Sequence, residues 1–251
     1  MTRPVLTRRF KLTLEYDGGP FVGWQRQENG LSVQQCLEEA VEKFCGERTV
    51  AYAAGRTDSG VHALAQVAHI DIAREAEPFR IKEALNYHLK PRPIAVTGAE
   101  QVDEGFHARF SAVERRYRYR IVNRRAPLTL DAGKAWQVGR PLDAEAMHEA
   151  ALPLIGHHDF TSFRAAECQA TSPVKTLTDI RVSRYGEEIE IALRAPSFLH
   201  HQVRNIVGTL APVGEGKKPV TWLATALRAA DRKKAGATAP ACGLYLERVI
   251  Y

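Results

Sequence analysis

Apolar and polar residues alternate near the start of the chain, and this spacing limits the fold more than any other feature of the sequence. Every second residue from Phe10 to Tyr16 is apolar, and the residues between them are charged or hydroxylated. Side chains two positions apart in an extended strand lie on the same face of a sheet. The segment therefore predicts a strand over residues 9–16 that buries one face, and Asp17-Gly18-Gly19-Pro20 predicts the turn that ends it.

Helices and strands alternate along the rest of the chain. Ser32 and Gln35 form a capping-box pattern that starts a helix, and Gly46 ends that helix. A second helix over residues 79–89 repeats an apolar residue at every fourth position, and Pro91 prevents its continuation. The other expected strands cover residues 49–53, 66–72, 94–101, 116–122, 176–182, 188–193 and 243–250, and the other expected helices cover residues 143–155, 198–213 and 220–229.

This alternation predicts an α/β fold of the α+β type in two halves. The strand over residues 94–101 closes the first alternation, so the halves cover residues 1–104 and 105–251. Nothing around residues 102–105 resembles a flexible linker. We therefore expect the two halves to share one sheet.

The composition is that of a globular protein without a membrane span. Of 251 residues, 45% are hydrophobic and 25% are charged, which is typical of a chain that buries a core. No apolar run approaches the length of a membrane helix, and the N-terminal segment with Arg3, Arg8 and Arg9 lacks the apolar core of a secretory signal. We expect a cytoplasmic protein whose four cysteines, which form no C-x-x-C pair, stay reduced.

Basic residues gather in one segment. Lysine and arginine exceed aspartate and glutamate by six (35 against 29), and residues 109–125 interleave arginines with aromatic residues. Cations bind phosphates and aromatic faces stack on bases, so this segment favours RNA over a membrane surface as a partner. The alternative is an edge strand that exposes its arginines to solvent.

One carboxylate lies in a short polar loop between apolar runs. The segment Ala54-Gly55-Arg56-Thr57-Asp58-Ser59-Gly60-Val61-His62-Ala63 contains two glycines, a cation and one aspartate. Glycine allows backbone geometries closed to other residues and lets a substrate approach closely. Arg56 is near enough in sequence to pair with Asp58 or with a phosphate beside it. Asp58 is therefore either a reactive group or the cap of a turn, since aspartate favours both places.

A second group of polar residues borders an apolar stripe. Over residues 198–213 we expect a helix that carries His200 and Arg204 one turn apart along the flank of this stripe. An arginine beside buried apolar residues needs a carboxylate partner. Asp58 is a natural partner, and the pairing would keep it ionised and therefore nucleophilic.

Two pairs of adjacent histidines suggest a metal site at first sight. Neighbouring residues on a helix point about 100° apart, so His157-His158 and His200-His201 are poor chelates, and no H-E-x-x-H spacing accompanies them. The chain also lacks the G-x-x-x-x-G-K-[ST], G-x-G-x-x-G and G-x-S-x-G patterns. We expect no metal and no nucleotide cofactor, and we expect hydrogen-bonding roles for His62 and His107 as well.

Several motifs follow one another in a fixed order along nearly the whole chain. They are Glu15-Tyr16-Asp17-Gly18, Gly23-Trp24-Gln25-Arg26-Gln27, the loop around Asp58, Phe106-His107-Ala108-Arg109-Phe110-Ser111-Ala112, Arg116-Tyr117-Arg118-Tyr119, Asp159-Phe160-Thr161-Ser162-Phe163-Arg164 and the segment His200–Gly208. This order resembles that of the tRNA pseudouridine synthase A (TruA) family. Independent motifs in order are specific, so they favour a reactive Asp58 over a capping one.

The resemblance implies a fold, an activity and a set of site residues. The fold is the pseudouridine synthase fold, with two ferredoxin-like halves, a mostly antiparallel sheet and a central active-site cleft. The activity is the isomerisation of uridine to pseudouridine at positions 38, 39 and 40 in the anticodon stem-loop of tRNA, by a homodimer without cofactor. Carried onto this sequence, Asp58 is the nucleophile, Arg204 pairs with it, Tyr117 stacks on the target base, Arg56 takes part in base flipping and Arg109 contacts the tRNA.

Some alternatives stay open at the level of the sequence. Tyr117 could belong to the core, because it shares a strand face with Tyr119 and Ile121, which we expect to be buried. Asp58 could attack C6 of the uracil or C1′ of the sugar, or remove the 2′ proton. A non-catalytic tRNA-binding protein and an N-glycosidase that releases free base are the competing functions.

Overall fold

The computed structural model describes residues 7–251, so Arg3 lies outside the described part of the chain. The described residues form two compact units. Unit 1 contains residues 7–113 and Leu246–Tyr251, and unit 2 contains Glu114–Tyr245. The chain enters unit 2 after Val113 and returns after Tyr245, so residues from both ends of the chain belong to unit 1.

Unit 1 is built on an antiparallel sheet. Its strands are β1 (Arg8–Tyr16), β2 (Tyr52–Ala53), β3 (His62–Ile72) and β4 (Ile94–Val102). Strand β1 lies between β3 and β4 and pairs antiparallel with both, while β2 pairs with β3. The C-terminal strand β11 (Leu244–Ile250) follows β3 in the strand order. The alternation predicted for β1 is confirmed, because every second side chain from Phe10 to Tyr16 is buried.

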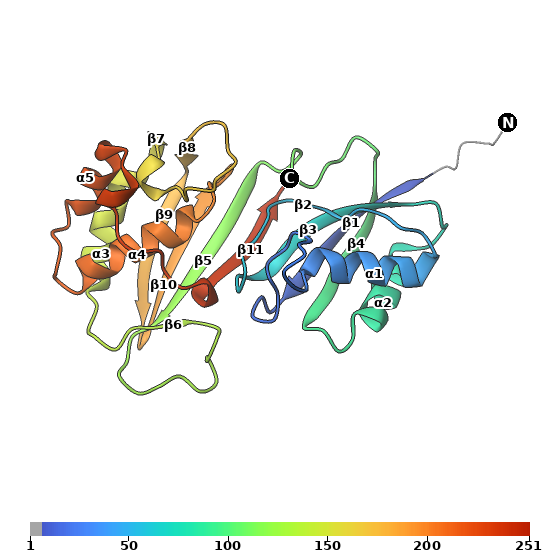
Figure 1. The fold of residues 1–251 in the computed structure, drawn as a ribbon, viewed down its shortest axis with the longest axis horizontal. Coiled ribbons are helices and arrows are strands. Elements are labelled where there is room, and N and C mark those ends of the chain that lie inside the picture. Colours follow the sequence, from blue (N-terminus) through green and yellow to red (C-terminus); the bar gives the residue numbers. More distant parts are fainter. Residues whose placement is uncertain (1–6) are drawn as a thin grey trace. The chain divides into compact units, whose positions relative to one another are not determined.

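The two helices of unit 1 begin and end where local sequence signals place them. Helices α1 (Val33–Cys45) and α2 (Pro78–Leu89) pack against each other beside the strands (Figure 1). The backbone N–H of Gln35 donates to the Ser32 hydroxyl (3.2 Å), and Gly46 ends α1 in a left-handed conformation with φ of 77°. The buried side chains of α2 are Ile81, Leu85 and Leu89, so the predicted spacing of its apolar face is confirmed.

Unit 2 contains paired strands of the nine-stranded sheet and a separate two-stranded sheet. Its strands are β5 (Glu114–Val122), β6 (Trp136–Gln137), β7 (Gly156–Asp159), β8 (Val174–Leu177), β9 (Asp179–Tyr185) and β10 (Glu188–Ala195). Strand β10 lies between β5 and β9, β6 pairs with β5, and β7 pairs with β8. The prediction of one strand over residues 176–182 is wrong. Thr178 interrupts it, and its N–H donates to the Arg194 carbonyl (2.8 Å).

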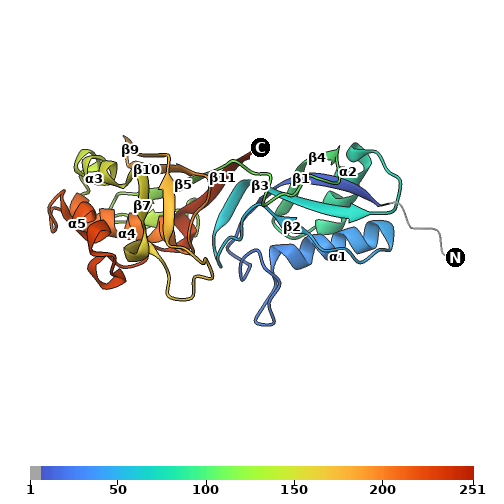
Figure 2. The same ribbon diagram turned by 90° about the horizontal axis from the view of Figure 1, so that it is seen from above.

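The three helices of unit 2 are shorter than predicted or begin later. Helices α3 (Ala144–Ala151), α4 (Gln202–Gly214) and α5 (Trp222–Ala229) contact one another and lie together in both views (Figure 1, Figure 2). Helix α3 gives way to a 3₁₀ turn because Pro153 has no N–H to continue it. Helix α4 begins after His201, whose left-handed φ of 62° excludes it from the helix.

The architecture is therefore a mixed α/β fold whose strand pairs are mostly antiparallel, and β5 and β6 form a short parallel pair. The predicted fold class is confirmed. Within residues 7–251, no helix is both long enough and apolar enough to cross a lipid bilayer.

Candidate active site

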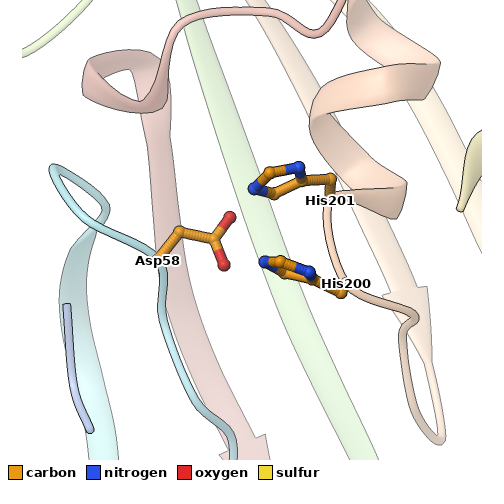
Figure 3. A group of neighbouring side chains, drawn as sticks. All are labelled: Asp58, His200 and His201. Atoms are coloured by element: carbon orange, nitrogen blue, oxygen red, sulfur yellow. The ribbon is translucent and has the colours of Figure 1, made fainter. Parts of the chain in front are cut away.

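Asp58 opens a tight turn between β2 and β3 of unit 1 (Figure 3). The backbone N–H of Val61 donates to the Asp58 carbonyl (3.1 Å), and Gly60 adopts the positive φ of 76° at the third position of this turn. The Asp58 side chain is partly buried. The prediction that glycine supplies an unusual backbone geometry in this loop is thus confirmed at Gly60. The turn fixes the backbone at Asp58.

A preceding segment of unit 1 holds the same loop by its backbone. Gly23 forms an isolated β-bridge with Asp58, and the N–H of Trp24 donates to the Thr57 carbonyl (3.0 Å). A Cβ at Gly23 would lie 2.6 Å from that carbonyl, and the φ of Gly23 is 112°. Only glycine fits this close approach without strain. Two motifs that are separate in the sequence therefore pack into one structure.

The histidines of the unit 1 motifs have structural roles, as predicted. His62 is buried, and its Nδ1 accepts the backbone N–H of Gly18 (3.0 Å). His107 accepts the N–H of Arg109 through Nδ1 (3.1 Å). Burial lowers the pKa of His107, and the positive charge of the nearby Arg9 lowers it further. A neutral imidazole with an accepting Nδ1 fits this hydrogen bond.

Two arginines of the unit 1 motifs lie at the surface. Arg56 is exposed and precedes Asp58 by two residues. Arg109 is also exposed, and its guanidinium carbon lies 5.6 Å from the ring centroid of Phe110, a side chain that is 76% exposed. An exposed cation beside an exposed ring has the chemistry to bind a phosphate and a base.

Tyr117 lies on β5 of unit 2 and is only partly buried. Tyr119 and Ile121, on the same face of the strand, are fully buried, as predicted. The Tyr117 ring meets the ring of Phe198 almost at a right angle (83°), with 5.0 Å between the centroids. This edge-to-face contact holds the Tyr117 ring in one orientation. The sequence did not identify Phe198 as its neighbour, because the pairing depends on tertiary structure.

Arg204 lies in the first turns of α4 and is held by a distant segment of unit 2. Its Nε donates to the Ala239 carbonyl (2.8 Å), and the Ala239 N–H donates back to the Arg204 carbonyl (3.1 Å). A Cβ at Gly208 would overlap the Ala237 carbonyl, and Gly236 packs closely on the Gly208 backbone. The segment 236–240, which we call the strap, was missed from the sequence. Its signal is the pair of glycines, one on the helix and one in the strap.

The predicted helical placement of His200 is wrong. Both His200 and His201 precede α4, on the segment that leads into it (Figure 3). Their rings are tilted by 38° with centroids 4.0 Å apart. The argument that excluded a chelate from helical geometry therefore does not apply to this pair. His157 and His158 lie on β7 and hydrogen-bond to Thr176 and to the Ile155 carbonyl (3.0 and 2.9 Å).

Three arginines of β5 are ion-paired within unit 2, namely Arg116, Arg118 and Arg120. Arg120 contacts both carboxylate oxygens of Glu188 on β10 (2.8 and 2.9 Å), and Arg118 pairs with Glu190 (3.5 Å). The hydrogen bond to Glu188 is the largest cause of the raised pKa of Arg120. Strand β5 is also flanked by β6 and β10, so it is not an edge strand. The edge-strand alternative is therefore wrong, and much of the charge of β5 is matched by glutamates, whereas RNA binding by residues 109–125 stays a prediction.

Comparison with known proteins identifies the family. A model of the tRNA pseudouridine synthase family matches residues 13–111 and 150–251. A tRNA pseudouridine synthase A of Rhodospirillum centenum is 61% identical over 244 residues, which cover 97% of this chain and 100% of that protein. One of Paramagnetospirillum magneticum is 62% identical over 97% of this chain and 95% of its own length. A third tRNA pseudouridine synthase A, from Parvibaculum lavamentivorans, is 58% identical over 97% of this chain and 99% of its own length.

The fold and the loop define a mixed α/β protein that presents a carboxylate on a turn held by backbone hydrogen bonds. The chain belongs to the tRNA pseudouridine synthase family. It is an isomerase that converts uridine in tRNA to pseudouridine.

The four cysteines are free thiols.

Proposed function

We propose that this enzyme modifies positions 38, 39 and 40 in the anticodon stem-loop of tRNA, with Asp58 as the nucleophile. The observation that carries the proposal is the Asp58 turn, which holds a single carboxylate by backbone hydrogen bonds on both sides. An ionised aspartate needs no neighbouring base to be nucleophilic, which agrees with a motif that contains no serine–histidine triad. The resemblance of the ordered motifs to the TruA family supplies the tRNA positions.

The other site residues have roles that suit their chemistry. A base within a stem is out of reach until it is flipped, at a cost of about a few kcal/mol, and the exposed Arg56 assists this step. Tyr117 stacks on the flipped base, a contact typically worth about 1–3 kcal/mol. Arg204 pairs with Asp58 and keeps it ionised. Arg109, beside the exposed ring of Phe110, contacts the tRNA.

The reaction exchanges one glycosidic bond for another. The bond between C1′ and N1 breaks, the uracil turns, and a new bond forms between C1′ and C5. C5 then loses its proton and N1 gains one, so the product is an isomer of the substrate. Asp58 can start this sequence by attack at C6, by attack at C1′ or by removal of the 2′ proton. These three routes predict different isotope effects at C2′.

Tritium release from tRNA labelled at uracil C5 tests the proposal. We expect release with the base retained on the RNA, and a loss of at least about 10³-fold in Asp58→Ala, the scale of removing a nucleophile. Free uracil in the supernatant would identify a glycosidase instead. Binding of tRNA without turnover by the wild type would leave only a non-catalytic RNA-binding protein.

Substrates with one uridine among positions 38, 39 and 40 test the choice of site. Each should release tritium, and a tRNA with uridine at none of the three should release none. We further propose that the enzyme works in the cytoplasm as a homodimer, with the tRNA spanning both subunits. Light scattering measures the mass of the protein with and without tRNA, and a monomer under both conditions would contradict the dimer.

A further inference from the structure

Three polar side chains are buried directly behind the Asp58 loop in unit 1. Tyr16 of β1, Thr57 of the loop and Gln66 of β3 are 5%, 6% and 0% exposed. Buried polar groups cost free energy unless they are hydrogen-bonded, so such a cluster persists only where its bonds are made. The pseudouridine synthase roles assigned above use none of these three residues.

The hydrogen bonds of the Gln66 amide have a defined direction. The Gln66 amide nitrogen donates to the Gly55 carbonyl (2.8 Å) and to the Tyr16 hydroxyl (3.4 Å), while the amide oxygen accepts the N–H of Val67 (3.2 Å). Turning the amide over would place its oxygen against the Gly55 carbonyl, so this orientation is fixed. The Tyr16 hydroxyl also shares a hydrogen bond with the Thr57 hydroxyl (2.8 Å), in which either oxygen can be the donor.

This chain of bonds ends on the residue next to Asp58. Thr57 is held by its side chain through Tyr16 and by its carbonyl through the N–H of Trp24 (3.0 Å). Gly55, on the other side of Arg56, is held through Gln66. The loop is therefore fixed on both sides of Arg56 and immediately before Asp58. These hydrogen bonds fix the backbone before Asp58 and therefore the direction in which the Asp58 side chain points.

A direct chemical role for Tyr16 does not fit its surroundings. Burial raises the pKa of Tyr16 to about 12, so the phenol stays protonated near neutral pH. Its ring lies 6.3 Å from that of Trp24 and belongs to the core of unit 1. Tyr16 can act on the reaction through Thr57 alone.

We propose that Tyr16, Thr57 and Gln66 are positioning residues that aim the Asp58 carboxylate at its target atom. The proposal rests on the proposed function of Asp58 as the nucleophile. A reacting group that is misplaced by about 1 Å can lose 10²-fold in rate. The cluster thus acts on the chemical step and leaves the binding of tRNA unchanged.

Single hydroxyl deletions test the proposal. Tyr16→Phe and Thr57→Val should each lower the single-turnover rate on saturating enzyme about 10- to 100-fold. The Kd for tRNA should stay close to wild type, while the melting temperature should fall by about a few degrees, because each deletion leaves a buried partner without its bond. Thr57→Ser restores the hydroxyl and should recover most of the rate. Thr49→Val is the matched control, since it removes a threonine hydroxyl that donates to the Asp71 carbonyl in the same unit (2.9 Å).

The double variant Tyr16→Phe/Thr57→Val tests the bond itself. It should be no slower than the slower single variant, because one bond cannot be removed twice. Wild-type rates in both single variants would overturn the proposal. So would a fall in rate that follows the melting temperature in every variant, Thr49→Val included. If Thr57→Val does not fold, the rate of Tyr16→Phe is sufficient to test the proposal, because this change removes one oxygen and keeps the ring.

Asp58→Ala separates this proposal from the one it rests on. Full activity in Asp58→Ala would overturn the role of Asp58. An inactive Asp58→Ala beside a fully active Tyr16→Phe and Thr57→Val would overturn the positioning role alone.

Discussion

Asp58 in unit 1 and Arg204 in unit 2 are held by different means. The Asp58 turn is held by residues of the same unit whose motifs are readable along the first part of the chain, from Tyr16 to Gln66. Arg204 lies in the first turn of α4, a helix without a side-chain cap bond, and is held by the strap at Ala239. The first arrangement is specified by neighbouring motifs, and the second by a segment that returns much later in the sequence.

The starts of two helices show the same difference. Helix α1 has Ser32 at its N-cap, with an extended backbone and a hydroxyl that accepts a backbone N–H. Helix α4 has His201 there, in a left-handed conformation that non-glycine residues adopt only at a cost. Strain of this kind persists where the surrounding structure determines the backbone. Local signals therefore predict α1 well and misplace the start of α4.

The largest expected loss of stability comes from a substitution on α4 where the strap packs against it. In Gly208→Ala, the added methyl group overlaps the Ala237 carbonyl, so the strap must move away from α4. We expect a loss of about 3 kcal/mol or more in the free energy of unfolding, the upper range for overpacking. Urea denaturation measures it. Gly105→Ala is the control, because the space around Gly105 is open, and equal effects of the two changes would contradict a strap that packs closely.

A pH effect tests a long-range contact inside unit 1. His69 on β3 accepts the N–H of Ala108 through Nδ1 (3.1 Å), next to Arg109. Burial lowers the pKa of His69 from 6.5 to about 4, and Arg9 adds to the shift. As the pH falls from 6.5 towards 4, the unfolded chain takes up a proton that the folded chain refuses. Stability should therefore fall by about 2 kcal/mol between pH 7 and pH 5.

The comparison with His69→Asn isolates this contribution. Asparagine keeps an acceptor near the position of Nδ1 but does not titrate, so the variant should lose less stability than the wild type over the same pH range. Urea denaturation at pH 7 and pH 5 measures both. Equal losses would mean that His69 is protonated in the folded protein, and that this segment of unit 1 is less tightly packed than the strap.

The smallest expected loss of stability comes from removing the N-cap hydroxyl of α1. Ser32→Ala removes the acceptor for the Gln35 N–H and should cost about 1 kcal/mol. Thr221→Ala is the matched change in unit 2, where Thr221 precedes α5 without a side-chain cap bond. It should cost only about a few tenths of a kcal/mol by the same measure. A larger cost at Thr221 than at Ser32 would reverse the contrast between the units.

Much of the fold follows from patterns within short segments. The alternation in β1, the spacing of Ile81, Leu85 and Leu89, and the cap and stop of α1 are all confirmed, because each depends on neighbouring residues. The break at Thr178 was missed, since the acceptor of its N–H lies on another strand. Arg118 and Arg120 of β5 were interpreted as available cations because their glutamate partners lie on β10.

The sequence by itself determined the family, the mixed α/β class and the loop that presents Asp58, because these depend on ordered motifs and on local periodicity. Only the tertiary structure decided what holds the functional side chains. Phe198 against Tyr117, the strap on Arg204, and the bonds from Gln66 through Tyr16 to Thr57 all join residues that are far apart in the chain. Packing and hydrogen-bond satisfaction select such partners in three dimensions, and no local pattern records them.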